Sequence, residues 1–428
     1  MAETLIVNGA VTVNGTGLLS IENNAGLRQI DDSAVNSGNI IVKRTATPTI
    51  RLDYTAWSSP VTGQQLQAFS PNTVSTRFYQ YLYTGTTTPT AYQSVTATTN
   101  FLAGKGYMIR AADNASSTVA SAYNGQFTGV PNNGIINQNM GQGFNLLGNP
   151  YASPISANSF LTANSSVGTL YFWTNTTAAS GGVYPQNNFA AYTSGTGGVA
   201  AFASGKVPNG TIQTGQGFYL RKTTAGTTNA IFNNAQRVNA SVSTQFYRNA
   251  ETTSVETEKH RIWLNLNDNS NAYNQILVGY VEGATNGAEN NFDGLSLESS
   301  SSSIYSIIND DKYVIQGKTL PFTDEDIVPL GLNAITAGLY KISLETIDGL
   351  FTTQDVFLKD KYTNITHNIK QSAYQFSTQD GIFDDRFELV YRAGVLSNDD
   401  FTNDNDVLVY TQNNQIEVNS LKENIATV

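Results

Sequence analysis

The chain contains an internal duplication, and no other feature of the sequence constrains its fold as strongly. Residues 144–155 read FNLLGNPYASPI, and a diverged copy, IRLDYTAWSSPV, occupies residues 50–61. Two further landmarks follow each copy in the same order: an aromatic segment and then a Gly-x-Gly segment, at residues 77–81 and 103–110 in the first copy and at 170–174 and 214–221 in the second. Three landmarks in one order predict two units of the same fold, over residues 46–128 and 129–240.

Each unit is predicted to be a strand, a sharp turn and further strands. Proline has a fixed φ and no amide donor, so Pro60 and Pro150 mark places where a strand stops. A glycine directly before an alternating aromatic segment indicates a bulge or a close backbone approach. A phosphate-binding loop is the alternative, but it requires a helix after the glycines, whereas another strand is predicted there. Short alternating segments between Thr-, Gly- and Asn-rich turns are typical of β-sandwiches.

Composition limits the protein to a few classes. The chain has 428 residues, no cysteine and 13% charged residues. This length supplies a large core without disulfides, and the lack of cysteine excludes thiolate metal sites while remaining compatible with secretion. No apolar run is long enough for a membrane-spanning helix. Residues 1–4 lack the basic start and apolar core of a signal peptide, so an exported protein is expected here as a mature fragment or with an added methionine.

Charge is distributed unevenly along the chain. Residues 46–240 hold 8 Lys and Arg against 2 Asp and Glu, whereas residues 241–428 hold 12 against 27. This change predicts a domain boundary near residue 240. The basic residues of the middle region are scattered singly and form no recognisable motif, so we expect no nucleic-acid partner.

The N-terminal residues 1–45 are predicted to be the end and cap of a parallel β-solenoid. Aliphatic strands of three or four residues alternate with Asn-Gly corners at residues 8–9 and 14–15. Asn-Gly can also close a tight hairpin, but such short repeated strands fit solenoid rungs better. We expect the last part of a longer array, capped by the units that follow.

The C-terminal half is predicted to hold a further β-domain and the start of another. A polar segment at residues 250–259 precedes strands with clean alternation, which predict a β-sandwich over residues 258–392. An acidic linker at 393–406 follows, and two strands then begin at Val407 and Gln415 within residues 407–428. The predicted fold class is therefore all-β: the end of a parallel β-solenoid, a duplicated pair of β-sandwich-like units, a third β-sandwich, and the first strands of an Ig-like sorting domain.

Residues suited to catalysis are sparse. A two-carboxylate glycosidase needs paired acids, but Asp53 and Asp113 are the only acids within 46–240, and neither has a counterpart in the second unit. The two histidines, His260 and His367, would need nearby acids such as Asp268 or Asp384 to form a metal site or a nucleophile–base pair. No catalytic motif surrounds either histidine. We therefore predict a protein that is not an enzyme, with no catalytic residues and no cofactor.

Calcium is the one metal that the composition leaves open. Asp- and Asn-rich clusters occur at residues 267–271, at 380–385 and in the linker at 393–406. None has the spacing of an EF-hand loop, although irregular oxygen cages also bind Ca²⁺. Turn formation explains the first cluster equally well, and a solvated linker explains the last.

Aromatic residues near the duplicated turns are candidate glycan contacts. Trp57, Tyr151 and Trp173 lie there, and flat rings can stack on sugar faces. Core packing is the favoured alternative, because large aromatic side chains supply much of the buried area of a sandwich.

The sequence resembles a known class of exported proteins. The segments 143–151, 168–174 and 215–218 are similar to the region before the sorting domain in large surface proteins of Bacteroidota exported by the type IX secretion system. Residues 259–266 and 384–391 resemble the ends of the domain that usually follows. The tail from Asp406, especially 415–420, resembles the opening strands of a type A sorting domain and stops before its remaining strands.

This resemblance implies a location and partners but no chemistry. It implies a secreted or cell-surface protein that passes through the periplasm and the outer membrane, with the type IX outer-membrane translocon and its β-barrel shuttle protein as partners. We therefore expect a non-enzymatic stalk and export scaffold, for example in an adhesin for attachment or gliding motility. The alternatives are a pair of carbohydrate-binding modules in 46–240 that binds surface glycans, and an accessory part of an enzyme whose active site lies upstream.

Overall fold

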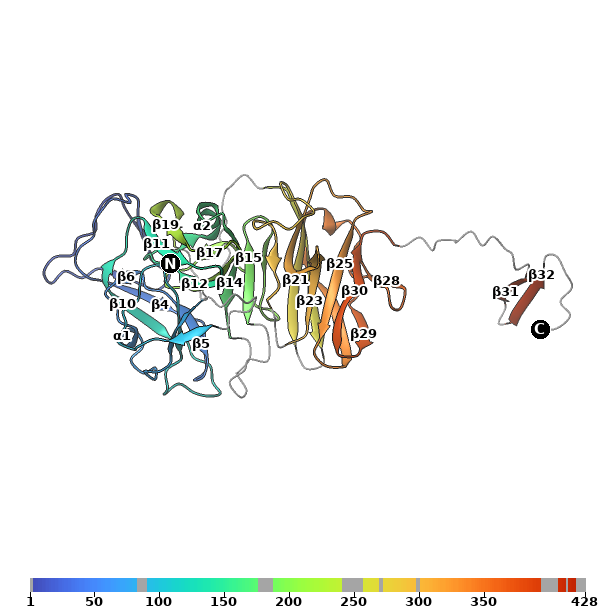
Figure 1. The fold of residues 1–428 in the computed structure, drawn as a ribbon, viewed down its shortest axis with the longest axis horizontal. Coiled ribbons are helices and arrows are strands. Elements are labelled where there is room, and N and C mark those ends of the chain that lie inside the picture. The colour runs from blue at the N-terminus through green and yellow to red at the C-terminus, as the bar shows by residue number, and fades with distance from the viewer. Residues whose placement is uncertain are drawn as a thin grey trace. The chain divides into compact units, whose positions relative to one another are not determined.

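The computed structural model of the chain describes residues 3–82, 91–175, 188–240, 257–268, 272–297, 301–393, 407–412 and 415–420 (Figure 1). It contains two compact units, Met1–Tyr391 and Arg392–Val428. Strands dominate, and the two α-helices among these residues, α1 (Leu66–Phe69) and α2 (Ala157–Ala163), have four and seven residues. The predicted all-β class is confirmed. No helix in the described part of the chain is both long and apolar enough to cross a membrane.

Parallel strand pairs form the N-terminal part of the first unit. β1 (Thr4–Val7) pairs in parallel with β3 (Gly26–Gln29), and β2 (Ser20–Ile21) pairs in parallel with β4 (Ile40–Thr45). The strands after residue 25 therefore lie beside the strands before it and run in the same direction. On its other side β4 pairs antiparallel with β10 (Asn124–Pro131), so the first repeat covers this stack.

The two repeats have sheets with the same strand order, as the duplication requires. In each sheet the first long strand of the repeat pairs with the last long strand. The last strand also pairs with the second, and the second pairs with the third. The first sheet is β5 (Tyr54–Trp57), β9 (Tyr107–Arg110), β7 (Phe78–Tyr81) and β8 (Tyr92–Ser94). The second is β12 (Gly143–Gly148), β18 (Gly217–Lys222), β14 (Val167–Trp173), β15 (Phe189–Thr193) and β16 (Gly197–Val199). The repeats contain further strands outside these sheets: β6 (Val61–Thr62), β11 (Ile136–Met140), β13 (Ile155–Ser156), β17 (Thr211–Ile212) and β19 (Thr228–Phe232).

The strand register corrects the alignment of the two motifs. Trp57 lies opposite Tyr107 in the first sheet, and Leu147 lies opposite Phe218 in the second. Trp57 is therefore the structural equivalent of Leu147. Pro60 consequently corresponds to Pro150, and not to Pro154 as the aligned sequences imply. In the aligned motifs, Pro60 stands opposite Pro154, a second proline that follows Pro150 in the second repeat.

The repeats meet each other through reciprocal backbone contacts. The Ser58 amide donates to the Gly215 carbonyl at 2.9 Å, and the Gly148 amide donates to the Gly104 carbonyl at 3.0 Å. Ser58 is equivalent to Gly148, and Gly215 is equivalent to Gly104. Each bond is therefore the counterpart of the other, with the donor in the first repeat in one bond and in the second repeat in the other. The antiparallel bridges Trp57–Gln216 and Lys105–Leu147 show the same exchange. The repeats are therefore related by a local pseudo-two-fold axis.

Glycines make this approach possible. Gly104 and Gly215 have φ values of +79° and +74°, which favour glycine. A Cβ on Gly148 would lie 2.3 Å from the Ser58 Cβ, and one on Gly106 would lie 2.4 Å from the Leu147 carbonyl oxygen. The Gly-x-Gly segments are thus places of close backbone approach followed by strands, as predicted, and not phosphate loops.

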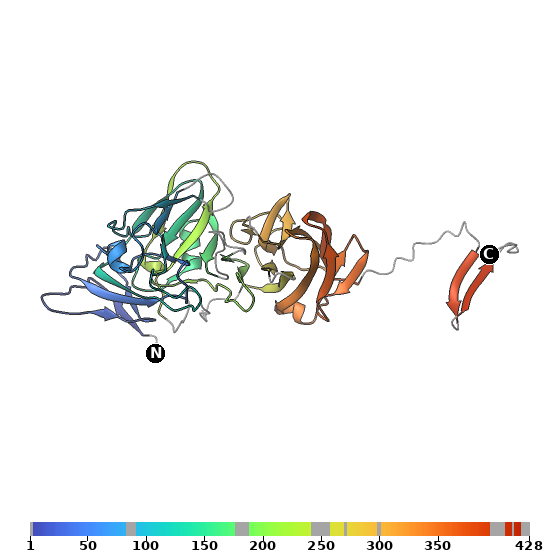
Figure 2. The ribbon, with the colours of Figure 1, turned by 90° about the horizontal axis from the view of Figure 1, so that it is seen from below.

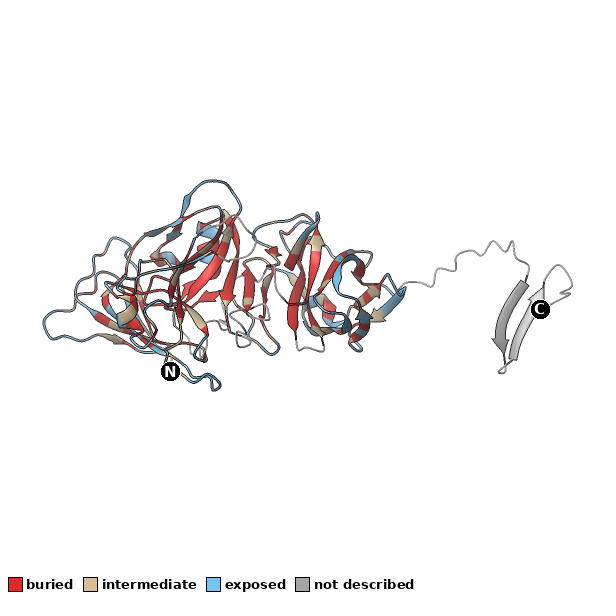
Figure 3. Ribbon diagram, turned by 60° about the horizontal axis from the view of Figure 1, so that its bottom comes forward, coloured by how far each residue is buried: buried red, intermediate tan, exposed pale blue. Residues whose placement is uncertain are grey.

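The inner faces of the two sheets share a hydrophobic core, which we call the shared core. It also includes residues of the C-terminal sheet, and buried residues continue through the strands on both sides of that contact (Figure 3). Its buried members are Ala56, Tyr81, Met108, Phe144, Leu146, Tyr171, Ala191, Val199, Tyr219, Trp263, Leu277, Leu297, Val314 and Ile315. The outer faces of the two repeats have separate cores, so each sheet is covered on both sides.

The C-terminal part of the first unit, expected as a sandwich, is one sheet of eleven strands that curls around its own core (Figure 2). Most of its order is β28-β27-β30-β25-β23-β24-β21-β20-β26-β29, and β22 pairs with β24. The strands are β20 (Lys259–Asp268), β21 (Tyr273–Val281), β22 (Gly294–Leu295), β23 (Ser303–Ile308), β24 (Asp311–Lys318), β25 (Ile327–Ala334), β26 (Gly338–Ile347), β27 (Phe357–Asp360), β28 (Ile365–Asn368), β29 (Tyr374–Thr378) and β30 (Gly381–Val390).

The second unit contains an antiparallel pair, β31 (Val407–Gln412) and β32 (Gln415–Ser420), in which Val407 lies opposite Ser420. Both strands begin where the sequence predicts them. The domain boundary predicted near residue 240 adjoins residues 241–256, which lie outside the described residues, as do most of the polar segment 250–259 and of the acidic linker 393–406.

The close approach at Gly148 can be tested by adding a single methyl group. We expect Gly148→Ala to destabilise the protein by about 1–3 kcal/mol, because the new Cβ overlaps Ser58 on the pseudo-two-fold axis. Denaturant midpoints measure the change. Gly9→Ala is the control, because a Cβ there meets nothing within 4 Å, and its effect should stay within about 0.5 kcal/mol. Equal effects of the two substitutions would contradict the contact.

Candidate functional site

Two of the three predicted glycan contacts are buried in cores. The Trp57 side chain is 2% exposed and makes edge-on contacts with Phe69, Tyr123 and Phe127. Tyr151 is fully buried, and its hydroxyl donates to the Gly134 carbonyl at 2.6 Å. Neither ring presents a face on which a sugar could stack, so the structure does not fit a glycan role for these two residues. Core packing, the favoured alternative, describes both.

Trp173 is the most accessible of the three, but it joins the repeats. Its indole Nε1 donates to the Tyr54 carbonyl at 2.9 Å, and its ring packs edge-on against Phe189 with centroids 5.2 Å apart. The residue is half-buried at the rim of the shared core. Its ring therefore has a structural role between the two sheets.

The histidines and the acids of the first repeat also have structural partners. His260 Nδ1 accepts from the Leu350 amide at 3.1 Å, and its Nε2 lies 3.0 Å from a Glu258 carboxylate oxygen. His367 Nε2 lies 2.8 Å from the Ser372 carbonyl oxygen, to which it donates. Asp53 accepts from the Ile50 amide, and Asp113 pairs with Arg110 at 2.8 Å.

The acidic cluster at 380–385 does not form a cation cage. Asp384 accepts from the Tyr305 hydroxyl at 2.5 Å, whereas Asp385 accepts from the Tyr362 hydroxyl at 2.8 Å. Neighbouring residues of β30 point to opposite faces of the sheet, so these carboxylates diverge. Within the described ranges, no three acids or histidines come together in a way that could hold a metal. The other two calcium candidates, 267–271 and the linker, extend beyond the described residues.

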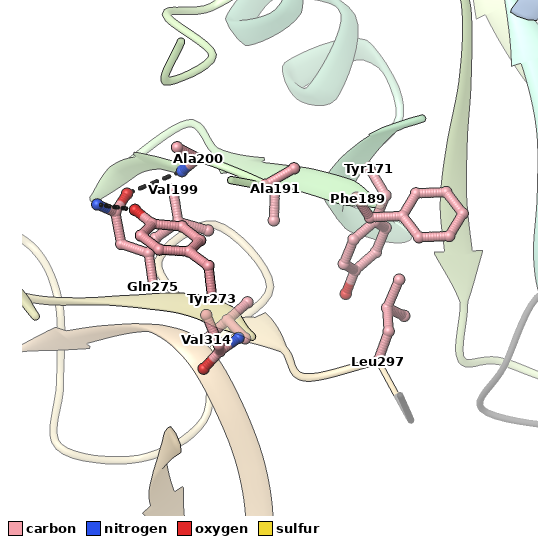
Figure 4. A pocket seen from close by; sticks show the side chains of 11 residues that line it. Tyr171, Phe189, Ala191, Val199, Ala200, Tyr273, Gln275, Leu297 and Val314 are labelled. Atoms are coloured by element: carbon pink, nitrogen blue, oxygen red, sulfur yellow. Dashed lines mark hydrogen bonds between the residues drawn. The ribbon is translucent and has the colours of Figure 1, made fainter. Parts of the chain in front are cut away.

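The second repeat and the C-terminal sheet form a closely packed junction. β15 packs against β24, and β16 packs against β21 and β24. Figure 1 shows the junction where β15 lies beside β21. Gln275 accepts from the Ala200 amide at 2.8 Å and donates to the Tyr273 hydroxyl at 3.0 Å (Figure 4). The cavity at this point measures about 10 Å³, which leaves room for a single water at most. The two parts therefore meet through a nearly solid interface.

A loop of the C-terminal part, residues 285–293, lies over the edge of the second repeat. The Gly195 amide donates to the Asn291 carbonyl at 2.8 Å, and the Thr169 hydroxyl donates to the Asp293 carbonyl at 3.1 Å. A Cβ on Gly168 would lie 1.8 Å from the Asn290 carbonyl oxygen, so this approach requires glycine. The loop is fixed to the repeat by its backbone.

An open groove lies between this loop, β18 and the start of β24. Its volume is about 300 Å³, within the range of small-ligand sites. Arg221, Glu289, Asn290 and Asp311 are at least partly exposed along it, while the floor contains buried tyrosines and a buried aspartate. We call it the junction groove, lined by Gly168, Thr169, Tyr171, Arg221, Thr223, Ala288, Glu289, Asn290, Asp293, Leu295, Asp311 and Tyr313.

The buried aspartate of the junction groove, Asp293, holds the loop together. One carboxylate oxygen accepts from the Glu289 amide at 2.6 Å, and the other accepts from the Gly317 amide at 2.8 Å. Burial raises the pKa of this carboxyl to about 7, although both hydrogen bonds oppose the rise. A perturbed acid in a groove is a feature of functional sites, but both oxygens are engaged by backbone amides. Asp293 therefore has a structural role in the loop.

Sequence reasoning did not find this groove. Arg221 belongs to the second Gly-x-Gly landmark and, unlike its equivalent Arg110, has no acid three residues later, but this difference alone does not predict a groove. Asp293 and Glu289 lie in a polar loop with no motif. The residues meet only because β14 packs against β22, and β15 packs against β22 and β24.

Comparisons with known proteins identify a family without an assigned activity. The fold and the groove define an all-β protein with a candidate binding site at an internal junction. A family model described as "Domain of unknown function (DUF8693)" matches residues 1–391, and the chain belongs to this family. No curated protein and no solved structure matches the chain.

The core position of Trp57 predicts a large effect on stability. We expect Trp57→Ala to lower the free energy of unfolding by about 3–5 kcal/mol, because it opens a cavity among three aromatic rings. Trp173→Ala should cost less, since that ring is only half-buried. Denaturant unfolding of the two variants compares them directly, and a larger loss for Trp173→Ala would contradict the assignment.

The buried carboxyl of Asp293 predicts a pH effect. The unfolded chain releases this proton near the usual aspartate pKa of about 4, whereas the folded chain releases it near 7. Between these values the folded state binds more protons, so its stability falls as pH rises. The Tm of the wild type should therefore fall relative to that of Asp293→Asn as the pH rises from 5 to 8. A difference that does not change with pH would contradict the buried titration.

Proposed function

We propose that the chain is a non-enzymatic stalk and export scaffold of a type IX secretion substrate, located on the cell surface or secreted. It would support an adhesive part of such a protein during attachment or gliding. The proposal combines the resemblance of the sequence to this class with the way in which the first unit is built. The matching family has no assigned activity and is neutral on this point.

The observation that carries the proposal is the continuity of the cores from the first repeat to the C-terminal sheet. The shared core contains buried residues of both repeats and of the C-terminal sheet, so the three parts cannot separate without exposing apolar surface. Trp263 adds a hydrogen bond from its Nε1 to the Gly198 carbonyl at 2.9 Å across the same junction. A series of β-modules joined in this way resists bending and stretching, as a stalk must.

The division of the chain supports the export part of the proposal. The β31–β32 pair belongs to a compact unit separate from residues 1–391. A sorting signal has to be reached by the translocon and the shuttle protein while the cargo keeps its own fold, and a separate C-terminal unit meets this requirement. The lack of cysteine means that the first unit needs no disulfide formation during its passage through the periplasm.

Protease accessibility in intact cells tests the location. In a bacterium with a functional type IX system, we expect external protease to digest the protein, and we expect protection in a strain that lacks the outer-membrane translocon. A periplasmic protein serves as the control for cell integrity. Removal of residues 393–428 should leave a folded first unit inside the cell. Periplasmic retention of the intact protein in the competent strain would overturn the proposal.

A further inference from the structure

We propose that the junction groove is a binding site for an acidic saccharide, a sugar that carries a carboxylate, with Arg221 as the residue that binds the acidic group. This proposal does not depend on the export role. It also places glycan recognition away from Trp57 and Tyr151, whose rings are buried.

Arg221 differs from its equivalent in the first repeat. Arg110 pairs with Asp113 at 2.8 Å, so its charge is neutralised locally. No described residue accepts a hydrogen bond from the Arg221 guanidinium or forms an ion pair with it. A guanidinium presents a planar set of donors that matches a carboxylate in bidentate geometry. The duplicated arginine thus has a structural partner in one repeat and is available to a ligand in the other.

Arg221 is also placed so that its positive charge lies at the groove. It shares a face of β18 with Tyr219, a buried member of the shared core, and lies where that core ends. Burial raises the pKa of the Tyr171 and Tyr313 hydroxyls, and the nearby charge of Arg221 opposes this rise. The guanidinium therefore lies near both tyrosines of the groove floor.

The carboxylates of the groove are better placed to accept hydrogen bonds from hydroxyl groups than to bind a cation. Glu289 and Asp311 line the groove with Asp293, yet the three carboxylates do not converge as a metal site would require. One Glu289 oxygen accepts from the Thr285 amide at 2.7 Å, which leaves the other as an acceptor. Separate acceptors along a groove match the spaced hydroxyl groups of a sugar ring. A saccharide in which a carboxylate lies among several hydroxyls can use both the arginine and these acceptors.

The groove is held in place before any ligand binds. Asp293 closes the 285–293 loop through two backbone amides, and the Tyr171 hydroxyl donates to the Leu295 carbonyl at 3.0 Å. The Thr196 hydroxyl adds a bond to the Phe292 carbonyl at 2.7 Å. Because both walls are fixed to one rigid junction, little conformational freedom is lost on binding.

Calorimetric titration of the full chain with trigalacturonate tests the proposal, with neutral trigalactose and free glutamate as comparison probes. We expect trigalacturonate to bind, with an affinity that falls as salt increases, and both comparison probes to bind at least tenfold more weakly. Arg221→Gln should weaken trigalacturonate binding by about ten- to hundred-fold, since it removes charged hydrogen bonds. Arg110→Gln, at the equivalent position of the first repeat, should leave binding unchanged.

A second variant separates a saccharide from a cationic ligand. Asp311→Asn keeps a hydrogen-bond acceptor but removes a negative charge, so trigalacturonate binding should be retained or strengthened, whereas binding of a cationic group would be lost. Thermal melts verify that each variant is folded, which is expected because Arg221 has no structural partner in the described part of the chain. Absence of trigalacturonate binding, equal affinity of Arg221→Gln and the wild type, or tighter binding of glutamate would overturn the proposal.

Discussion

The structure depends on the close backbone approach of the two repeats, in which the Gly-x-Gly segment of each repeat bonds to the end of the first strand of the other. Gly148 and Ser58, which occupy equivalent positions, face each other across a pseudo-two-fold axis at a distance that excludes a second side chain. This contact sets the spacing of the two sheets and turns their inner faces toward each other. The shared core can form only because the backbones come this close, and it then determines where the C-terminal sheet packs.

The junction groove is a consequence of this arrangement. Where the shared core ends, β18 contributes Arg221, β24 contributes Asp311 and Tyr313, and the 285–293 loop covers the remaining side. Duplication gave both repeats an arginine at the same position, and in the second repeat the strands β15 and β16 pack against the C-terminal sheet. Two differences therefore distinguish these residues of common origin: the ion pair of Arg110 with Asp113, and the packing of the second repeat on the C-terminal sheet.

The chemistry of the groove fits recognition and structural roles. Its buried aspartate, which could otherwise act as an acid or base, uses both oxygens to hold a loop. The histidines lie elsewhere, in β20 and β28, and bond to neighbouring backbone groups. Closely packed β-modules with a fixed polar groove are compatible with the two roles proposed above, mechanical support and ligand binding.

The sequence by itself determined the all-β class, the duplication, the glycine positions and the start of the C-terminal strands, because alternation, turn residues and repeated landmarks are local signals. It did not determine that 258–392 is one curled sheet, since β20, β21 and β26 pair across long separations. It also aligned Pro60 with Pro154, because a proline signals a turn without specifying the register. The burial of Trp57 and Tyr151 and the groove at Arg221 were decided only by tertiary structure, because exposure depends on which faces pack together.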